Sequence, residues 1–473
     1  MHRFILSLTI LWPLLLLPIA AAAQTLPAIA VYFNKSVDTT LAYPPGNVAK
    51  GNTDLGAVAA QEIAKAKSSV DMAMYNLNVQ SVVDALIAAQ KRGVKVRVVG
   101  HVENGGDQKF QQLVSAGIPL ITNPRAPSGE QQPLMHNKFF VIDARPGAPS
   151  GSQPVTMMGS WNATFAQTYT DPNNLVIIRD AAVTAAYLKE FEEMWGGADD
   201  APNGGAAAFG AAKTNNTPHT FTVDGTRIDV YFSPSDGTAS RINDALLTGQ
   251  SSIYTANLTF TYSQFASSLS RQKNRGADVR CIIDNVKDQG SQFSALQSFA
   301  EAFDWQLAGI FHHKYAVMDA IPLGTGTFPV VVTGSHNFTV SAETRNDENT
   351  AIIYSAAIAN QFLQEFAARY KEVGGKAPFV QATAVDALQS ATAIALRAYP
   401  NPFNSHVAIA VEGLTEQATI TIASITGERV ASFALDPGQP IAEWDATDLA
   451  PGIYVATVAS QSQRRFVALQ VAR

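Results

Sequence analysis

A motif of one histidine, one lysine and one aspartate occurs twice in this chain, and no other feature of the sequence restricts its fold as strongly. Each copy has the spacing H-x-K-x4-D and is followed by a G-S-x-N turn, at residues 159–162 and 334–337. The copies consist of His136, Lys138 and Asp143, and of His312, Lys314 and Asp319. A repeated motif with a matching tail is highly specific. It indicates that the chain contains one structural unit in duplicate.

The duplication extends well beyond the motifs. Each half is predicted to begin as strand, helix, strand, helix and strand, and to end in a strand and a helix. The expected elements are residues 28–33, 55–67, 69–75, 79–92, 94–99, 175–178 and 180–195, and residues 227–232, 241–247, 252–256, 264–275, 279–283, 350–354 and 356–373. This alternation predicts two α/β/α sandwich halves with mixed sheets. The loops 143–159 and 319–334 contain Pro and Gly and are expected to be exposed hairpins.

The residue types of the motif suit phosphoryl chemistry. His136 and Lys138 stand two apart in a run of aromatic and β-branched residues, so both side chains point to one face of a strand. The second copy has the same spacing. An imidazole can be a nucleophile or a proton carrier near neutral pH, and an ammonium group holds a phosphate oxygen as a point charge. These groups together can act on a phosphate without a metal.

The repeated motif resembles that of the phospholipase D superfamily, whose members have two such motifs in one chain or one in each subunit of a dimer. The resemblance covers residues 28–372. It implies a phosphodiesterase in which one histidine attacks phosphorus, giving a covalent phosphohistidine, while the other protonates the leaving oxygen. Water or an alcohol then resolves the intermediate. Because both motifs lie in one chain, a monomer is expected, and no cofactor is implied.

The resemblance also assigns roles to residues. His136 is expected to be the nucleophile and His312 the general acid, because family members with both motifs in one chain generally use the first; the reverse assignment stays open. Lys138 and Lys314 would hold the non-bridging oxygens. Side chains of the two G-S-x-N turns would add donors to the substrate: the amides of Asn162 and Asn337 and the hydroxyls of Ser160 and Ser335.

Two kinds of carboxylate accompany the motifs. Asp143 and Asp319 are seven residues from their histidines, so strand alternation turns them away from the reacting face and they are expected to be structural. Glu348 stands where the family often has a carboxylate that orients an imidazole, whereas Asn173 occupies the matching position of the first half. In the family this partnership crosses between halves. Glu348 would then orient His136, and His312 would face a neutral partner or Asp171.

Other histidines and the one cysteine have less defined roles. Alternation directs His313 away from the site, while His336 and His101 could line it. A zinc site made of His312, His313 and His336 is conceivable, but no cysteine and no H-E-x-x-H spacing supports one, and no metal is expected. Cys281 lies in an apolar strand and is expected to be buried and inert.

The first residues are typical of a secretory signal peptide. Residues 1–23 contain Arg3, an apolar run over 4–19 and three alanines before Gln24; a retained membrane anchor is the alternative. No later segment has the roughly 20 uninterrupted apolar residues that a membrane span needs. The predicted order is then a first domain at 24–196, a linker at 197–219 with little structure of its own, and a second domain at 220–374.

After a second linker at residues 375–395, the pattern changes to alternating strands over 396–473, which predicts a small all-β sandwich. The segments 399–404 and 448–454 resemble the C-terminal sorting domain of the type IX secretion system. This implies a Gram-negative bacterium of the Bacteroidota kind and export through the periplasm, by the type IX machinery, to the medium or cell surface, with removal of the module. A sandwich that binds carbohydrate or a surface is the alternative, for which Trp444 is a candidate.

The motifs leave the substrate open, since phospholipids and nucleic acids present the same phosphodiester. The chain has 33 basic and 39 acidic residues and a net charge of -6, which provides no overall attraction to nucleic acid. No basic run with interleaved aromatics occurs. We therefore expect a secreted phospholipase D. A secreted metal-independent nuclease is the alternative, because residues 334–349 resemble the small bacterial nucleases of the family; a phospholipid-forming transferase and a non-catalytic surface-binding protein are further alternatives.

Overall fold

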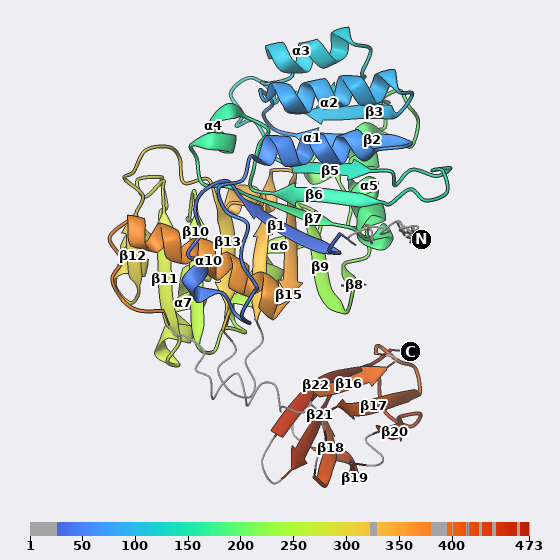
Figure 1. The fold of residues 1–473 in the computed structure, drawn as a ribbon, viewed down its shortest axis with the longest axis vertical. Helices are drawn as coiled ribbons and strands as arrows, with labels where there is room; N and C mark the ends of the chain where they lie inside the picture. The colour runs from blue at the N-terminus through green and yellow to red at the C-terminus, as the bar shows by residue number, and fades with distance from the viewer. Residues whose placement is uncertain are drawn as a thin grey trace, which may run out of the picture.

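The computed structural model describes residues 26–321, 329–379, 395–399, 401–412, 414, 416–424, 428–437, 441–460 and 464–472. The predicted signal peptide therefore lies outside the described residues, as do most of the second predicted linker and part of the loop at 319–334. Figure 1 shows two α/β halves and, apart from them, a smaller β module at the C-terminus.

The first half is built on a seven-stranded sheet in the order β1-β7-β6-β5-β2-β3-β4. Its strands are β1 (Ile29–Phe33), β2 (Ser69–Met74), β3 (Lys95–Gly100), β4 (Leu120–Thr122), β5 (Lys138–Ile142), β6 (Val155–Gly159) and β7 (Asn174–Ile178). Strands β2, β3 and β4 are parallel, and the remaining pairs are antiparallel, so the sheet is mixed.

The second half repeats this order in an eight-stranded sheet, β12-β11-β10-β13-β14-β15-β9-β8. Its strands are β8 (Thr220–Val223), β9 (Thr226–Ser233), β10 (Ser252–Asn257), β11 (Asp278–Ile283), β12 (Glu301–Asp304), β13 (Lys314–Met318), β14 (Val330–Gly334) and β15 (Glu348–Tyr354). The motif strands β5 and β13 occupy equivalent central positions. Each motif is therefore held between neighbours on both sides.

Helices cover both sheets. The longer ones are α1 (Leu55–Lys65), α2 (Gln80–Lys91), α3 (Gln108–Ser115), α5 (Ala181–Trp195), α6 (Thr238–Leu246), α7 (Ser263–Asn274) and α10 (Ala356–Glu372), and the short ones are α4 (Phe165–Tyr169), α8 (Phe293–Gln297), α9 (Val340–Thr344), η1 (Thr39–Leu41) and η2 (Gly210–Ala212). One apolar core lies between α1, α2 and the first sheet, another between α6, α7 and the second sheet. A third core joins both sheets to α5 and α10. The predicted fold class is confirmed.

Local signals explain where the helices begin and end. The Asp180 carboxylate accepts hydrogen bonds from the backbone N–H groups of Ala182 and Val183, which caps α5. The same helix ends at Gly196, whose φ of 87° is in the left-handed region that glycine favours. Within α5, Glu190 accepts a hydrogen bond from the side-chain amide of Asn137, the residue after His136.

The first predicted linker has one turn of 3₁₀ helix and is largely exposed, but Gly210, Lys213 and Thr217 are buried. The Lys213 ammonium is buried and pairs with Glu190 of the first half and Asp347 of the second, at 3.4 Å from the latter. The backbone N–H of Gly210 also donates to Asp347, at 2.7 Å. The linker therefore fixes the two halves to each other, a contact that its Gly- and Ala-rich composition did not predict.

The segment after α10 is likewise packed. The Arg280 guanidinium donates to the backbone carbonyl oxygens of Ala377 and Pro378 and lies 4.6 Å from the centre of the Phe379 ring. The start of the second predicted linker is thus held against the second half as far as Phe379.

The C-terminal module is a sandwich of two antiparallel sheets with one apolar core. Its strands are β16 (Ala395–Tyr399), β17 (His406–Glu412), β18 (Ala418–Ser424), β19 (Arg429–Leu435), β20 (Ile441–Asp445), β21 (Gly452–Ser460) and β22 (Arg464–Val471). Trp444 is only 4% exposed and packs between Phe403 and Tyr454. The suggestion that Trp444 could bind a sugar is wrong, because strand alternation turns its ring into the core.

The motif aspartates Asp143 and Asp319 close the motif strands. The Asp143 carboxylate accepts hydrogen bonds from the backbone N–H groups of residues 67, 68 and 69, and Asp319 does the same for residues 250, 251 and 252. Both residues have a positive φ, 55° and 50°. Each carboxylate ties the end of its motif strand to the start of the neighbouring strand.

We predict that Asp143→Ala lowers the free energy of unfolding by about 2–3 kcal/mol, because three backbone N–H groups, that of the buried Ser69 among them, lose their acceptor. Urea unfolding followed by fluorescence measures the change. Asp224→Ala is the matched control, since Asp224 also has a positive φ, 46°, but is exposed in the β8–β9 turn. Equal losses in both variants would show that backbone strain, and not the buried carboxylate, is responsible.

Candidate active site

The two motifs meet at one site because each is bound to the opposite half. The backbone N–H of His136 donates to the carbonyl oxygen of Asp347 at 3.0 Å, and that of His312 donates to Pro172 at 3.2 Å. Each histidine stands two residues before its motif strand, β5 or β13. This exchange across the halves places both histidines beside residues that follow the other motif.

His136 is paired with Glu348. Its Nδ1 lies 2.9 and 2.8 Å from the two carboxylate oxygens. Burial acts to raise the pKa of Glu348, but His136 and Lys138 outweigh it and hold that pKa below its usual value. The carboxylate is therefore ionised and can only accept, so Nδ1 of His136 bears the proton. Nε2 is left with its lone pair, as a nucleophile requires.

His312 is paired with Asn173, not with Asp171. Its Nδ1 lies 3.0 Å from Oδ1 of Asn173. The Asn173 amide nitrogen donates to the backbone carbonyl oxygens of Gln167 and Asp171, which fixes the orientation of the amide. His312 thus faces a neutral acceptor where His136 faces an anion. The two pseudo-equivalent histidines have different electrostatic surroundings.

Ser160 and Ser335 hold these partners. The Ser335 hydroxyl donates to Glu348 at 2.6 Å, and the Ser160 hydroxyl donates to Oδ1 of Asn173 at 3.0 Å. A hydroxyl has one proton, which is used here. In this arrangement the two serines position the residues that orient the histidines, and their expected contact with the substrate stays a prediction.

Both motif lysines are buried and cationic groups crowd the site. Lys138 and Lys314 each donate to the backbone carbonyl oxygen of the preceding motif histidine, at 2.8 Å, which leaves further donors on each ammonium. Burial lowers the pKa of Lys138 to about 7, although Glu348 opposes the shift. Burial and the neighbouring Lys138 lower the pKa of Lys314 well below its usual value. The site is poised to receive an anion that would restore these pKa values.

The same causes act on the imidazoles. Burial, with Lys138 and Lys314, lowers the pKa of His136 to about 4, against the influence of Glu348. Burial and then Lys314 lower the pKa of His312 well below its usual value. Each histidine is affected by the lysines of both motifs, as expected when all four residues surround one space.

Asn162 and Asn337 occupy equivalent turns after β6 and β14. Each turn starts with a glycine, Gly159 or Gly334, because a Cβ there would collide with the backbone of the adjoining strand. In the described part of the chain, the amide oxygen of each asparagine has no hydrogen-bond partner. Each of these oxygens is an acceptor, so it suits a donor group of a ligand and not a phosphate oxygen.

Tyr75 was not predicted as a site residue. Its ring packs against both His136 and His101, with ring centroids 5.0 Å apart in each case, and the Lys138 ammonium lies 5.3 Å from its centre. Its position directly after the buried strand β2 could have identified it, since residues at that end of β2 face the motif. His101 is itself buried, 3.1 Å from the amide oxygen of Asn123.

The remaining histidines of the motif regions differ in position. His313 lies on the opposite strand face, where its Nε2 is 3.0 Å from Glu365. His336 is buried, and its Nε2 lies 3.6 Å from the Glu343 carboxylate. Within the described ranges, no group of three or more His, Cys, Asp or Glu residues is arranged to hold a metal ion.

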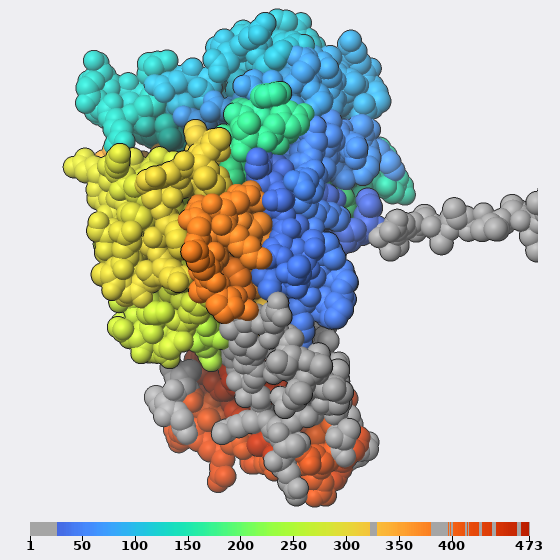
Figure 2. Space-filling view, turned by 60° about the vertical axis from the view of Figure 1, so that its left-hand side comes forward, coloured from blue at the N-terminus to red at the C-terminus, as the bar shows by residue number. Residues whose placement is uncertain are grey.

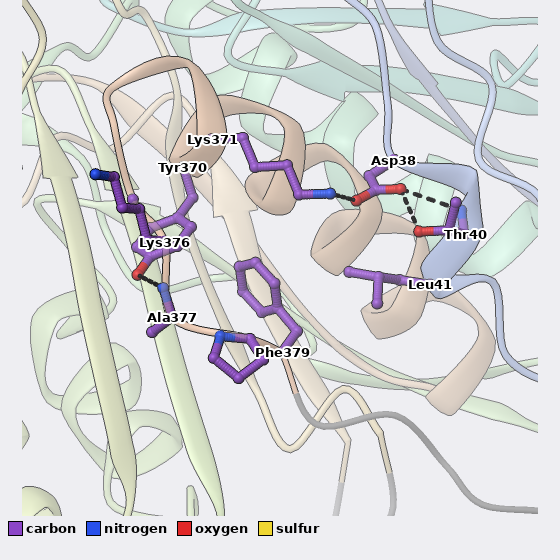
Figure 3. Close-up of a pocket in the computed structure, with 10 residues that line it drawn as sticks. Asp38, Thr40, Leu41, Tyr370, Lys371, Lys376, Ala377 and Phe379 are labelled. Atoms are coloured by element: carbon purple, nitrogen blue, oxygen red, sulfur yellow. Dashed lines mark hydrogen bonds and ion pairs between the residues drawn. The ribbon is translucent and has the colours of Figure 1, made fainter.

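A separate pocket of about 470 Å³ lies between η1 and the end of α10. Figure 3 shows Phe379 and Leu41 at its wall and the ion pair between Lys371 and Asp38 at its edge. No motif residue lines it. It is therefore distinct from the site formed by the two motifs.

Comparison with known proteins agrees with this architecture. The family model described as the PLD-like domain of cardiolipin synthase matches residues 59–195 and 242–370, more than half of the chain, and the model of the secretion system C-terminal sorting domain matches residues 397–470. The chain therefore belongs to the phospholipase D-like family. It is a phosphodiesterase of the hydrolase class, and its C-terminal module is a sorting domain for secretion. Among the residues that the structure describes, no helix has the length and apolar character to cross a membrane.

Individual relatives cover part of the chain. Phospholipase D of Rickettsia bellii is 30% identical over 146 residues, which are 30% of this chain and 69% of the relative. Mitochondrial cardiolipin hydrolase of Xenopus tropicalis is 36% identical over 141 residues, 29% of this chain and 63% of the relative. The match thus spans about two thirds of the length of these relatives.

Two solved structures are also similar. Phosphatidylserine synthase of Haemophilus influenzae aligns with a TM-score of 0.48 and 13% identity over 67% of this chain and 83% of that chain. Nuc of Salmonella typhimurium, a phospholipase D family member, aligns with a TM-score of 0.26 and 22% identity over 35% of this chain and 93% of that chain.

We predict a bell-shaped dependence of kcat/KM on pH, displaced to acid. On the acid side, kcat/KM should fall below about pH 4, where the His136 imidazole becomes protonated. On the alkaline side, kcat/KM should fall at or below about pH 7, where Lys138 loses its proton and His312 is neutral. Asn173→Asp should move the alkaline limb upward, because a carboxylate favours the imidazolium form of His312. Initial rates from pH 3.5 to 9.5 measure both profiles, and a plateau extending to pH 9 would contradict the assignment.

We predict that Glu348→Gln lowers kcat by about 10²–10⁴-fold, the range expected when an orienting carboxylate is replaced by a neutral group. Gln can keep the side-chain size but cannot stabilise a positive imidazole. The circular dichroism spectrum should be unchanged. An equal loss for Asn173→Ala would show that both partners act only by orientation and that the charge of Glu348 has no role.

Proposed function

We propose that this secreted phosphodiesterase hydrolyses phospholipids through a covalent phosphohistidine, with His136 as the nucleophile and His312 as the general acid. One observation carries this assignment: the anionic Glu348 is hydrogen-bonded to His136, whereas His312 is bonded to the neutral Asn173. The nucleophilic imidazole becomes positively charged as its bond to phosphorus forms. A carboxylate on its other nitrogen stabilises that charge.

In the first step, Nε2 of His136 forms a bond to phosphorus while the bond from phosphorus to the leaving oxygen breaks. Nε2 of His312 gives its proton to that oxygen. The low pKa of His312 in the empty site is opposed by the bound phosphodiester anion, which favours protonation. In the second step, water attacks phosphorus, its proton passes to His312, and the bond to His136 breaks. The enzyme returns to its starting protonation state.

The remaining site residues bind the phosphate. Lys138 and Lys314 would hold the non-bridging oxygens, and their charge is stronger in a buried site than in water. Asn162 and Asn337 would add amide donors to the same oxygens. Because these cations supply the charge stabilisation, we propose a reaction without a metal or organic cofactor. With both motifs in one chain, a monomer contains the whole site.

Two observations favour a phospholipid as the substrate. Relatives that match this chain are named as a phospholipase D and a cardiolipin hydrolase. The net charge of -6 opposes non-specific attraction to nucleic acid. The sorting domain supports export by the type IX machinery, through the periplasm of a Gram-negative bacterium, with removal of the module. A secreted nuclease is the competing function.

The test uses the chain without residues 1–23 on phosphatidylcholine vesicles and on plasmid DNA, both in EDTA. We expect choline release without DNA nicking. In His312→Asn, the covalent adduct should accumulate on His136 and be visible by mass spectrometry, because water is no longer activated. His136→Ala should form no adduct and lose at least about 10³-fold in rate.

His219→Ala is the matched control. His219 is the residue before strand β8 and lies outside the site, so this variant should keep full activity. Nicking without choline release would make the protein a nuclease. An adduct on His312 in His136→Ala would reverse the two histidine roles. Loss of activity in EDTA that added metal restores would overturn the cofactor-free reaction.

A further inference from the structure

Large exposed apolar side chains are concentrated in the segments next to the site residues, and we call the surface of these segments the mouth of the site. In the described parts of the two halves, eight large apolar residues are exposed, and five of them flank the catalytic segments. We call these five the apolar rim: Phe165 (65% exposed), Tyr169 (47%), Leu307 (44%), Ile310 (48%) and Val340 (54%). An exposed cluster of this kind marks an interaction surface, whereas single exposed apolar residues are ordinary.

Three of the rim residues are close in sequence to site residues. Phe165 is three residues beyond Asn162, and Val340 is three residues beyond Asn337. Ile310 is two residues before His312. Since consecutive Cα atoms are about 3.8 Å apart, each of these residues is within about 12 Å of a site residue.

The loop that contains Leu307 and Ile310 packs against the segment that follows α4, the helix of Phe165 and Tyr169. The backbone N–H of Ile310 donates to the Asp171 carboxylate at 3.1 Å, which holds the loop before His312 against the end of α4. Gly309 has a φ of 82° and leaves no room for a Cβ at this contact. Within α4, the Phe165 and Tyr169 rings are 4.8 Å apart. Figure 2 shows α4, in green, on the molecular surface beside the yellow and gold part of the second half.

The equivalent surface on the other side of the site is polar. There, the loop before His136 is made of residues 124–134 and contains Arg125, Glu130 and Gln131. Gln131 accepts a hydrogen bond from Arg345, which follows α9. The pseudo-symmetry of the halves is therefore broken at the mouth, because the side next to His312 is apolar and the side next to His136 is polar. Val340, at the start of α9, is the rim residue on the polar side.

We propose that the apolar rim docks on a phospholipid bilayer and brings the catalytic site to the depth of the lipid phosphate. This inference rests on the proposed function and adds the physical state of the substrate. The phosphate of a bilayer lipid lies in the polar layer directly above the hydrocarbon. A site that must reach it needs apolar groups beside its mouth that enter the hydrocarbon boundary. Phe and Tyr suit this boundary.

Other occupants fit less well. A second copy of this chain bound to the rim would cover the mouth and exclude a substrate. A single-stranded nucleic acid could stack on Phe165 and Tyr169, but the net charge of -6 opposes its approach. The same net charge predicts that docking is apolar in origin. Binding to neutral phosphatidylcholine vesicles should thus be nearly independent of salt.

The test measures binding of the catalytically silent His136→Ala chain, otherwise full length after residue 23, to sucrose-loaded phosphatidylcholine vesicles at 0.1 and 0.5 M salt by sedimentation. Adding Phe165→Ser, or Leu307→Ser with Ile310→Ser, should weaken vesicle binding by at least about tenfold at both salt concentrations. Val48→Ser and Val114→Ser remove exposed apolar side chains, 51% and 42% exposed, that are not in the rim. These controls should bind like the parent chain.

A second measurement uses active protein with long-chain lipid in vesicles and with a short-chain phosphatidylcholine below its micelle concentration. Rim variants should lose at least about tenfold in rate on vesicles and much less on the monomeric lipid. Unchanged vesicle binding in the rim variants would overturn the docking proposal even if the enzyme is active. Absence of hydrolysis of either lipid would instead overturn the proposed function. Loss of single-stranded DNA binding, with vesicle binding intact, would assign the rim to nucleic acid.

Discussion

The structure depends on one exchange between its halves: Glu348 of the second half is buried against His136 of the first, and Asn173 of the first is buried against His312 of the second. A buried carboxylate without a partner is strongly destabilising, so the two halves must stay in register for Glu348 to remain ionised. The backbone hydrogen bonds of both histidines to the opposite half, the shared apolar core and the buried Lys213 all serve this register. The active site is thus also one of the polar contacts between the halves, together with those of α10 to residues 36–49.

The duplicated unit has diverged where chemistry requires a difference. Glu348 and Asn173 occupy equivalent positions, as do His313 and Asn137, yet in each pair one residue has a titratable side chain and the other a neutral amide. On the far side of the motif strands, His313 binds Glu365, while Asn137 binds Glu190. Pseudo-symmetry brings two imidazoles to one site, and the substitutions give them different acceptors, Glu348 and Asn173, on which the proposed roles of nucleophile and acid rest. The same divergence makes one side of the mouth apolar and the other polar.

Much of the fold could be predicted from the sequence, because long elements have strong local signals. The helices α1, α2, α5, α7 and α10 have apolar stripes, caps or terminal glycines, and the central strands are runs of Val, Ile and Met. The elements β4, β8, β12, α4, α8 and α9, each of three to five residues, and the eight-residue α3 were not predicted, since so few residues provide too little periodicity. Residues 155–159 and 330–334 were placed in exposed loops, which is wrong, because they form the buried strands β6 and β14. Trp444 was given a surface role although alternation buries it. The sequence did not predict that the hydroxyls of Ser160 and Ser335 donate to Asn173 and Glu348, because a turn sequence does not reveal what its hydroxyl will meet.

By itself, the sequence determined the residue types, the duplication and the strand parity that directs each His and Lys to one face and each Asp to the end of its strand. These are local properties, since they depend on a period of two residues. Only the tertiary structure decided which acceptor each histidine meets, because His136 and Glu348 are 212 residues apart and no local pattern encodes that contact. It also decided the pKa values, since they arise from burial and from charges that come together only when both halves close around one space.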